Sequence, residues 1–329
     1  MDREAKQQRP GRRQSMRDRH TRSTPGLGRK PPDGNLGHET QSQSRERPLS
    51  QRVVDACPRV PLCTGPNFDT MYSFAVLDLT CAATVVLPQT ERYQILEVID
   101  EEHWIPLIAA EPGRYELTKE SVGSRFAFAF VRTRVNMQDP ADLRLAAEVQ
   151  DGIAVEQAEP GSYQQPLTYD MDEILALRKA YNERKGKEGV TSEMIFGKKG
   201  ELSEEMRNFG VAVGWGGLPK EGAVYPFPDA VDSTDPHTLT LRDVPNHPRA
   251  FWSVTVYDED GFARGGHYNV NSAFAKPDAD GAFVIHFGGD QSQPNFLEIY
   301  PGWNVALRIY SPVGAYFDGS WTSPQLRRC

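Results

Sequence analysis

The sequence lacks the long apolar runs and the short motifs that mark several classes of protein. No stretch approaches the roughly 18–20 apolar residues of a membrane span, and the N-terminus has no apolar core of a secretory signal. Neither a Walker loop nor a Rossmann glycine pattern occurs, and no serine lies in a G-x-S-x-G elbow. These absences disfavour a membrane helix, nucleotide use and that type of serine hydrolase. We predict no cofactor.

The lack of an export signal predicts a cytoplasmic protein for the chain as written. A misassigned gene start that hides an export signal would instead make the protein periplasmic or secreted. Both locations stay open at this point.

Cysteine is scarce, and the four cysteines form no C-x-x-C pair. A four-cysteine zinc site is therefore not expected, and we predict no metal site. Cys57 and Cys63 could close a small loop in an oxidising compartment, although free thiols are the simpler expectation.

Residues 1–52 have few apolar side chains and many arginines. They hold thirteen Lys and Arg against six Asp and Glu, a charge of +7 that leaves −15 for residues 53–329. Such a segment buries too little apolar area to offset its ordering entropy, which predicts a disordered basic tail. It could bind nucleic acid or anionic lipid, be a solvated tail, or be an overlong gene start. No aromatic side chain lies between the arginines, and the remainder is acidic, so no specific nucleic-acid partner is expected.

The clearest structural pattern is a strand over residues 251–257, followed by an Asp260-Gly261 turn. Trp252, Val254 and Val256 alternate with residues that can face water or a second layer. Glycine tolerates the left-handed backbone of a tight turn, which predicts a hairpin arm. Similar patterns predict strands over residues 67–79, 84–87, 93–99, 126–132, 238–241, 265–271, 282–287 and 304–310.

Helical signals cluster in the middle of the chain. Asp139-Pro140 is typical of a helix start, a second helix is expected near Asp170, and a short third one after Ser203. The predicted fold is mainly β, with two antiparallel, jelly-roll-like β-sandwich domains joined by a short helical connector. The expected divisions are a disordered tail (1–52), a first sandwich that is incomplete if its lead-in is missing (53–138), the connector (139–212) and a second sandwich (213–329).

Several longer motifs resemble a bacterial two-part family. The front half, with residues 67–73, Asp78-Leu79 and Arg92-Tyr93, resembles domain of unknown function 1254. The back half resembles its usual companion, domain of unknown function 1214, through residues 216–219, 250–257, 268–272, 307–310 and 318–321. The resemblance implies two jelly-roll sandwiches with helices between them, and it brings no established catalytic residues. Family members usually have a longer folded lead-in where this chain has its basic tail.

The densest polar group lies at the entrance to the first predicted strand. Asp69 could act as a general base or metal ligand, and Tyr72 as a proton donor, with Asn67 beside them. The structural alternative is that Asn and Asp satisfy turn backbone groups while Tyr72 packs at the seam, meaning the region where the two sandwiches meet.

A second group lies near the mouth of the predicted hairpin. Tyr257, Tyr268 and Asn271 could line a ligand cleft, or they could simply pack at a sheet edge. His267 and His286 could join His103 in a metal site only if the domains face each other.

Two functions are consistent with these residues. The first is a hydrolase acting on a small molecule at the seam, with Asp69, Tyr72 and Tyr257 as catalytic candidates and Asn67, Tyr268 and Asn271 as ligand-binding candidates. The alternative is a non-catalytic ligand-binding or assembly protein. Fold alone does not decide between them, and homo-oligomerisation is left open.

Overall fold

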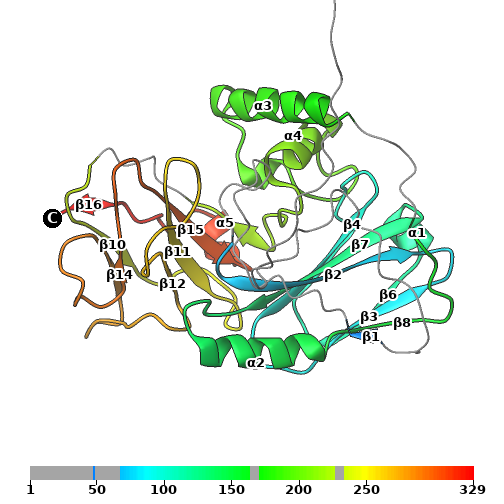
Figure 1. The fold of residues 1–329 in the computed structure, drawn as a ribbon, viewed down its shortest axis with the longest axis horizontal. Coiled ribbons are helices and arrows are strands. Elements are labelled where there is room, and N and C mark those ends of the chain that lie inside the picture. Colours follow the sequence, from blue (N-terminus) through cyan, green and yellow to red (C-terminus); the bar gives the residue numbers. More distant parts are fainter. Residues whose placement is uncertain (1–46, 49–66, 164–169, 227–232) are drawn as a thin grey trace, which may run out of the picture. The chain divides into compact units, whose positions relative to one another are not determined.

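The computed structural model describes residues 47–48, 67–163, 170–226 and 233–329. Their fold is mainly β and largely antiparallel, as the sequence predicts (Figure 1). Most of the predicted basic tail, together with Cys57 and Cys63, lies outside the described residues.

The first pair of sheets consists of strands from the front half of the chain. One sheet has the order β2-β7-β4-β5, and the other has the order β1-β8-β3-β6. Aliphatic side chains from both sheets form a common core that includes Val85, Leu96 and Val131. The bounds are β1 Arg47–Pro48, β2 Thr70–Asp78, β3 Ala83–Leu87, β4 Gln94–Asp100, β5 Leu107–Ala109, β6 Gly113–Leu117, β7 Phe126–Arg134 and β8 Ala154–Gln157. Strand β8, which lies within the range expected to be helical, pairs with β3.

The second pair of sheets comes from the back half. Its strand orders are β12-β11-β15-β9 and β14-β13-β10-β16, and among these described strands only β13 and β14 pair in parallel. Trp303, Leu239 and Val254 lie in its core. The bounds are β9 Ala223–Val224, β10 His237–Leu241, β11 Trp252–Tyr257, β12 Asn269–Asn271, β13 Phe283–Phe287, β14 Phe296–Leu297, β15 Asn304–Tyr310 and β16 Arg327–Arg328.

The three main helices begin where the sequence predicts, because each has a local capping side chain. Asp139 Oδ1 accepts a hydrogen bond from the Ala141 amide at 2.8 Å, and Asp170 and Ser203 cap the other two in the same way. The helices are α1 Lys119–Val122, α2 Pro140–Asp151, α3 Met171–Glu188, α4 Glu204–Gly214 and α5 Gly314–Phe317, with a 3₁₀ turn at Ser192–Met194. Helix α2 contacts β2 and β7, and α3 contacts α4 (Figure 1). In the described part of the chain, no helix has the length and apolar character that a membrane crossing requires.

Strand β11 has two buried faces, and this positions the candidate site. Trp252, Val254 and Val256 lie in the core of the second pair of sheets, whereas Ser253 and Thr255 are buried on the opposite face. The turn after β11 is as predicted: Gly261 has a φ of 82°, and the Asp258 carboxylate accepts hydrogen bonds from the amides of residues 260 and 262. The buried polar face of β11 therefore meets a second layer and not water.

Candidate functional site

Asp69 joins the two pairs of sheets at the seam. Its side chain is fully buried just before β2. Oδ2 accepts hydrogen bonds from Ser253 Oγ at 2.6 Å and from the Tyr310 hydroxyl at 3.0 Å, while Oδ1 accepts one from Asn269 Nδ2 at 2.8 Å. All three donors belong to the second pair of sheets, so one carboxylate from the front half binds three strands of the back half.

Asn67 holds this carboxylate in place. Its Oδ1 accepts a hydrogen bond from the Asp69 amide at 2.7 Å, which is the turn-stabilising role expected of an Asn at a strand entrance. Its Nδ2 donates to the Tyr310 hydroxyl at 2.9 Å, so Tyr310 is both a donor to Asp69 and an acceptor from Asn67.

Arg308 supplies the positive charge nearest to the Asp69 carboxylate. Nη1 lies 3.9 Å from Asp69 Oδ2 and donates to Thr255 Oγ1 at 3.1 Å, and Nη2 donates to the Tyr257 hydroxyl at 2.7 Å. Burial raises the pKa of the Tyr257 phenol, although the adjacent Arg308 opposes that shift. Arg308 thus links Asp69 to Tyr257 within one buried polar network.

Tyr72 lies near this network without donating to Asp69. It is half-buried on β2, and its ring makes an edge contact with Phe130 at a centroid distance of 4.8 Å. Burial raises the pKa of Tyr72 to about 12, while Arg132 opposes the rise. The structure therefore brings Asp69 and Tyr257 together through Arg308, and it places Tyr72 within electrostatic range of Arg308.

Tyr268 and Asn271 occupy packing and turn positions. The Tyr268 ring packs against Phe68 at 4.7 Å, and partial burial raises the pKa of its phenol. Asn271 lies opposite Ser253 in the β11–β12 register, and its Oδ1 accepts from the Ala273 amide at 3.1 Å. A functional role for any of the six predicted site residues stays a prediction.

The sequence interpretation missed five members of the network as site residues. They are Ser253, Thr255, Asn269, Arg308 and Tyr310. A signal for Arg308 and Tyr310 was present, since they alternate with core residues Leu307 and Ile309 along β15 and so share the face opposite the core.

A second buried polar group lies where the chain enters the second pair of sheets. Arg132 Nη1 lies 2.7 Å from Glu97 Oε2, and Arg132 Nη2 donates to the Gly216 carbonyl. The Gly216 amide donates to His103 Nε2 at 2.9 Å. Burial raises the pKa of Glu97 to about 7 despite the attraction of Arg132, and burial lowers the pKa of His103 to about 4.

The three histidines weighed as metal ligands have separate surroundings. His103 is buried beside Gly216, the His267 ring contacts Phe296, and His286 Nδ1 lies 2.8 Å from the Pro294 carbonyl oxygen. Within residues 67–163, 170–226 and 233–329, the structure contains no group of three or more His, Cys, Asp or Glu side chains suited to a metal ion.

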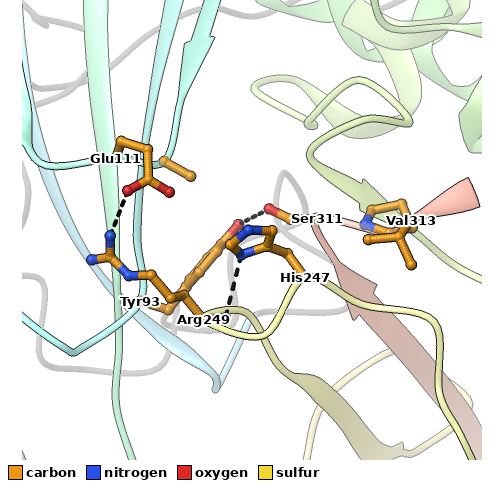
Figure 2. Close-up of a pocket in the computed structure, with 8 residues that line it drawn as sticks. Tyr93, Glu111, His247, Arg249, Ser311 and Val313 are labelled. Atoms are coloured by element: carbon orange, nitrogen blue, oxygen red, sulfur yellow. Dashed lines mark hydrogen bonds and ion pairs between the residues drawn. The ribbon is translucent and has the colours of Figure 1, made fainter.

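A surface pocket of about 210 Å³ opens at the seam, with walls from both halves of the chain (Figure 2). Tyr93 and Ser311 place their hydroxyl oxygens 3.1 Å apart, and Arg249 forms an ion pair of 2.5 Å with Glu111 (Figure 2). The His247 Nδ1 accepts from the Arg249 amide at 3.3 Å. Ala110, Pro312 and Val313 complete the lining.

An aromatic cluster connects the pocket to the Asp69 network. The Tyr93 ring lies 5.4 Å from Phe251 and 5.9 Å from Tyr310, and Phe251 stacks on Tyr310 at 4.3 Å. Because Tyr310 donates to Asp69 and Ser311 lines the pocket, consecutive residues of the chain belong to the two sites.

The comparisons with known proteins support the back-half resemblance. Residues 229–314 match the family model described as "Protein of unknown function (DUF1214)". None of the curated proteins matches the chain. For the front half, the resemblance to domain of unknown function 1254 stays a prediction.

The solved structures that this chain is similar to include proteins from Vibrio parahaemolyticus and Burkholderia cenocepacia. The VPA0106 protein from Vibrio parahaemolyticus is 17% identical, with 80% of this chain and 90% of that chain covered and a TM-score of 0.62. An uncharacterized protein from Burkholderia cenocepacia is 14% identical over 83% of this chain and 79% of that chain, with a TM-score of 0.46. At such identity, the similarity to the Vibrio protein shows a shared fold and no shared activity.

Proposed function

We propose that this chain is a small-molecule-binding protein whose ligand occupies the seam pocket. The observation that carries the proposal is the joint construction of the pocket: Tyr93 and Glu111 come from the front half, while His247, Arg249 and Ser311 come from the back half. Small-molecule sites are typically concave and mostly apolar, with a few convergent polar groups. The hydroxyl pair beside Pro312 and Val313 matches that description.

The charges of the pocket favour a neutral ligand. Arg249 is paired with Glu111, and its Nη2 also donates to the Thr90 carbonyl at 2.7 Å, so the guanidinium is already engaged. The Tyr93 and Ser311 hydroxyls can donate to, or accept from, an alcohol or phenol group. The ligand class is therefore a small neutral molecule with an apolar body and one hydroxyl or carbonyl group.

Calorimetric titration with phenol, cyclohexanol and benzamide tests the proposal. Val313→Trp fills the pocket and should abolish binding, whereas Val211→Trp on α4 is a matched control, because both valines are 38% exposed. Tyr93→Phe removes only a hydroxyl and should weaken binding several-fold. Failure of all three compounds to bind, or equal binding by Val313→Trp, would contradict the proposal.

The hydrolase hypothesis would instead use Asp69 as the base. Asp69 is fully buried and its carboxylate accepts three hydrogen bonds, so its oxygens are already engaged and are shielded from a substrate in this arrangement. The geometry therefore supports binding more than hydrolysis. An ester, amide and phosphoester panel distinguishes the two: turnover by the wild type that Asp69→Asn abolishes, with folding and ligand binding retained, would favour hydrolysis.

We also infer that the front half is a domain of the unknown-function 1254 type, and that each pair of sheets is a separate jelly-roll-like domain. The separate aliphatic cores support this division. Limited proteolysis tests it, since a protease-resistant fragment near residues 213–329 is expected.

A further inference from the structure

Thr70 and Arg134 form a cross-strand pair with two unused donors. They lie opposite each other in the antiparallel β2–β7 register, so their side chains project from the same face of the sheet. Thr70 Oγ1 and Arg134 Nε are both buried, and neither has a hydrogen-bond partner within the part of the chain that the structure describes. A buried donor without an acceptor is destabilising and rare, and an ion or water is a usual explanation.

Among the described residues, Arg134 has no carboxylate partner of its own. Asp142 is the nearby carboxylate, and Arg92 holds it in a two-point ion pair of 3.0 and 2.6 Å. Asp142 Oδ2 also accepts from the Asn136 amide at 2.7 Å. These three charged groups sum to +1. Partial burial lowers the pKa of Arg134, and the neighbouring Arg92 adds to this shift.

Phe251, from the back half of the chain, packs next to Arg134. The Arg134 guanidinium carbon lies 6.0 Å from the centre of the Phe251 ring, and Phe251 is fully buried. Thr70 is 2% exposed, whereas Arg134 is only half-buried. The side of the site next to Arg134 is therefore open to solvent, while its Thr70 side is enclosed.

We propose that Thr70 and Arg134 bind a small oxyanion at the seam. An oxyanion would accept hydrogen bonds from the Thr70 hydroxyl and the Arg134 guanidinium, and its charge would balance Arg134. The planar guanidinium fork matches the oxygen geometry of phosphate, sulfate and carboxylate groups. This site goes beyond the proposed neutral-ligand pocket and does not depend on it, because neither Thr70 nor Arg134 lines that pocket.

Calorimetric titration of the full chain with sodium phosphate, sodium sulfate and sodium acetate, at constant ionic strength, tests the proposal. We expect saturable binding of one anion per chain and an anion-dependent rise in Tm. Arg134→Gln should weaken binding at least tenfold. Thr70→Val keeps the shape of the side chain and should weaken anion binding several-fold. This second variant keeps the proposal testable if Arg134→Gln does not fold. Arg242→Gln, at an exposed ion pair, should bind as the wild type does.

The anion that binds distinguishes an inorganic tetrahedral oxyanion from the carboxylate of an organic acid as the ligand. Binding of phosphate or sulfate alone supports a tetrahedral oxyanion, and binding of acetate alone supports the carboxylate of an organic acid. The proposal is overturned if none of the three anions binds, or if Arg134→Gln binds them as tightly as the wild type.

Discussion

The Tyr310 hydroxyl donates a hydrogen bond of 3.0 Å to Asp69 Oδ2 across 241 positions of sequence. Tyr310 ends strand β15 of the second pair of sheets, and Asp69 immediately precedes β2 of the first. This contact and those of Ser253 and Asn269 make the Asp69 carboxylate the main polar connection between the two halves that the structure describes.

Replacing Asp69 should destabilise the protein strongly. Asp69→Asn leaves the buried Arg308 charge without its carboxylate partner, and the amide cannot accept all three existing hydrogen bonds. Breaking a buried charge pair in this way costs about 3–5 kcal/mol of unfolding free energy. Chemical denaturation measures this loss.

Two variants calibrate that measurement. Tyr310→Phe removes one hydrogen bond to the carboxylate and should cost about 1.5–3 kcal/mol. Asp280→Asn, at an ion pair whose Asp side chain is 81% exposed, should cost less than about 1 kcal/mol. Equal stability of Asp69→Asn and Asp280→Asn would show that the Asp69 network does not stabilise the fold.

Glu97 should make stability fall as the pH rises. Its pKa in the folded protein is about 7, above the ordinary 4.5, because burial disfavours the carboxylate. Between these values the folded state binds more protons than the unfolded state, so the stabilising contribution is complete below pH 4.5 and is lost toward pH 7. Glu97→Gln should remove this component. A wild-type advantage over Glu97→Gln that grows with pH would instead indicate a stabilising ion pair with Arg132.

His103 should have the opposite effect on stability. Its pKa is lowered from 6.5 to about 4 because burial disfavours the imidazolium. The unfolded state then binds more protons between these values, so the contribution is complete above pH 6.5 and is lost as the pH falls toward 4. As the pH rises from 4 to 6.5, the unfolding free energy of the wild type should increase relative to that of His103→Gln. Parallel curves would contradict a buried neutral imidazole.

Gly217 should tolerate no side chain. A Cβ at this position would overlap the Phe196 ring, so Gly217→Ala should lower the free energy of unfolding by roughly 1–3 kcal/mol. Gly186 in α3 is the matched control, because a Cβ there meets nothing within 4 Å. Gly186→Ala should raise the free energy of unfolding by about 0.5–1 kcal/mol. Thermal unfolding of both variants checks the difference, and a stable Gly217→Ala would show that the Phe196 ring can move.

The elements with local signals could be predicted from the sequence. The three main helices start at capping side chains that act within three residues, and strands such as β7 and β15 show regular alternation. Short strands were missed for a physical reason. Strand β6 carries exposed Arg114 and Glu116, and its order comes from pairing with β3, which no local pattern reveals.

The candidate site could be predicted only in part. Asp69 was identified from its polar neighbours, but its partners lie 184 to 241 positions away. Alternation along β11 showed that Ser253 and Thr255 share a face, and it left open whether that face meets water or protein. The answer depends on how the two pairs of sheets pack, which is a tertiary property of the whole chain.

Two hydrogen bonds to the Gly216 backbone restrict its conformation. His103 accepts from its amide and Arg132 donates to its carbonyl, so both torsions of this residue are clamped although glycine is the most freely rotating residue. Gly216 follows the end of α4 and precedes β9, where the chain passes into the second pair of sheets. Two side chains of the front half therefore hold the backbone at the point where the chain passes into the second pair of sheets.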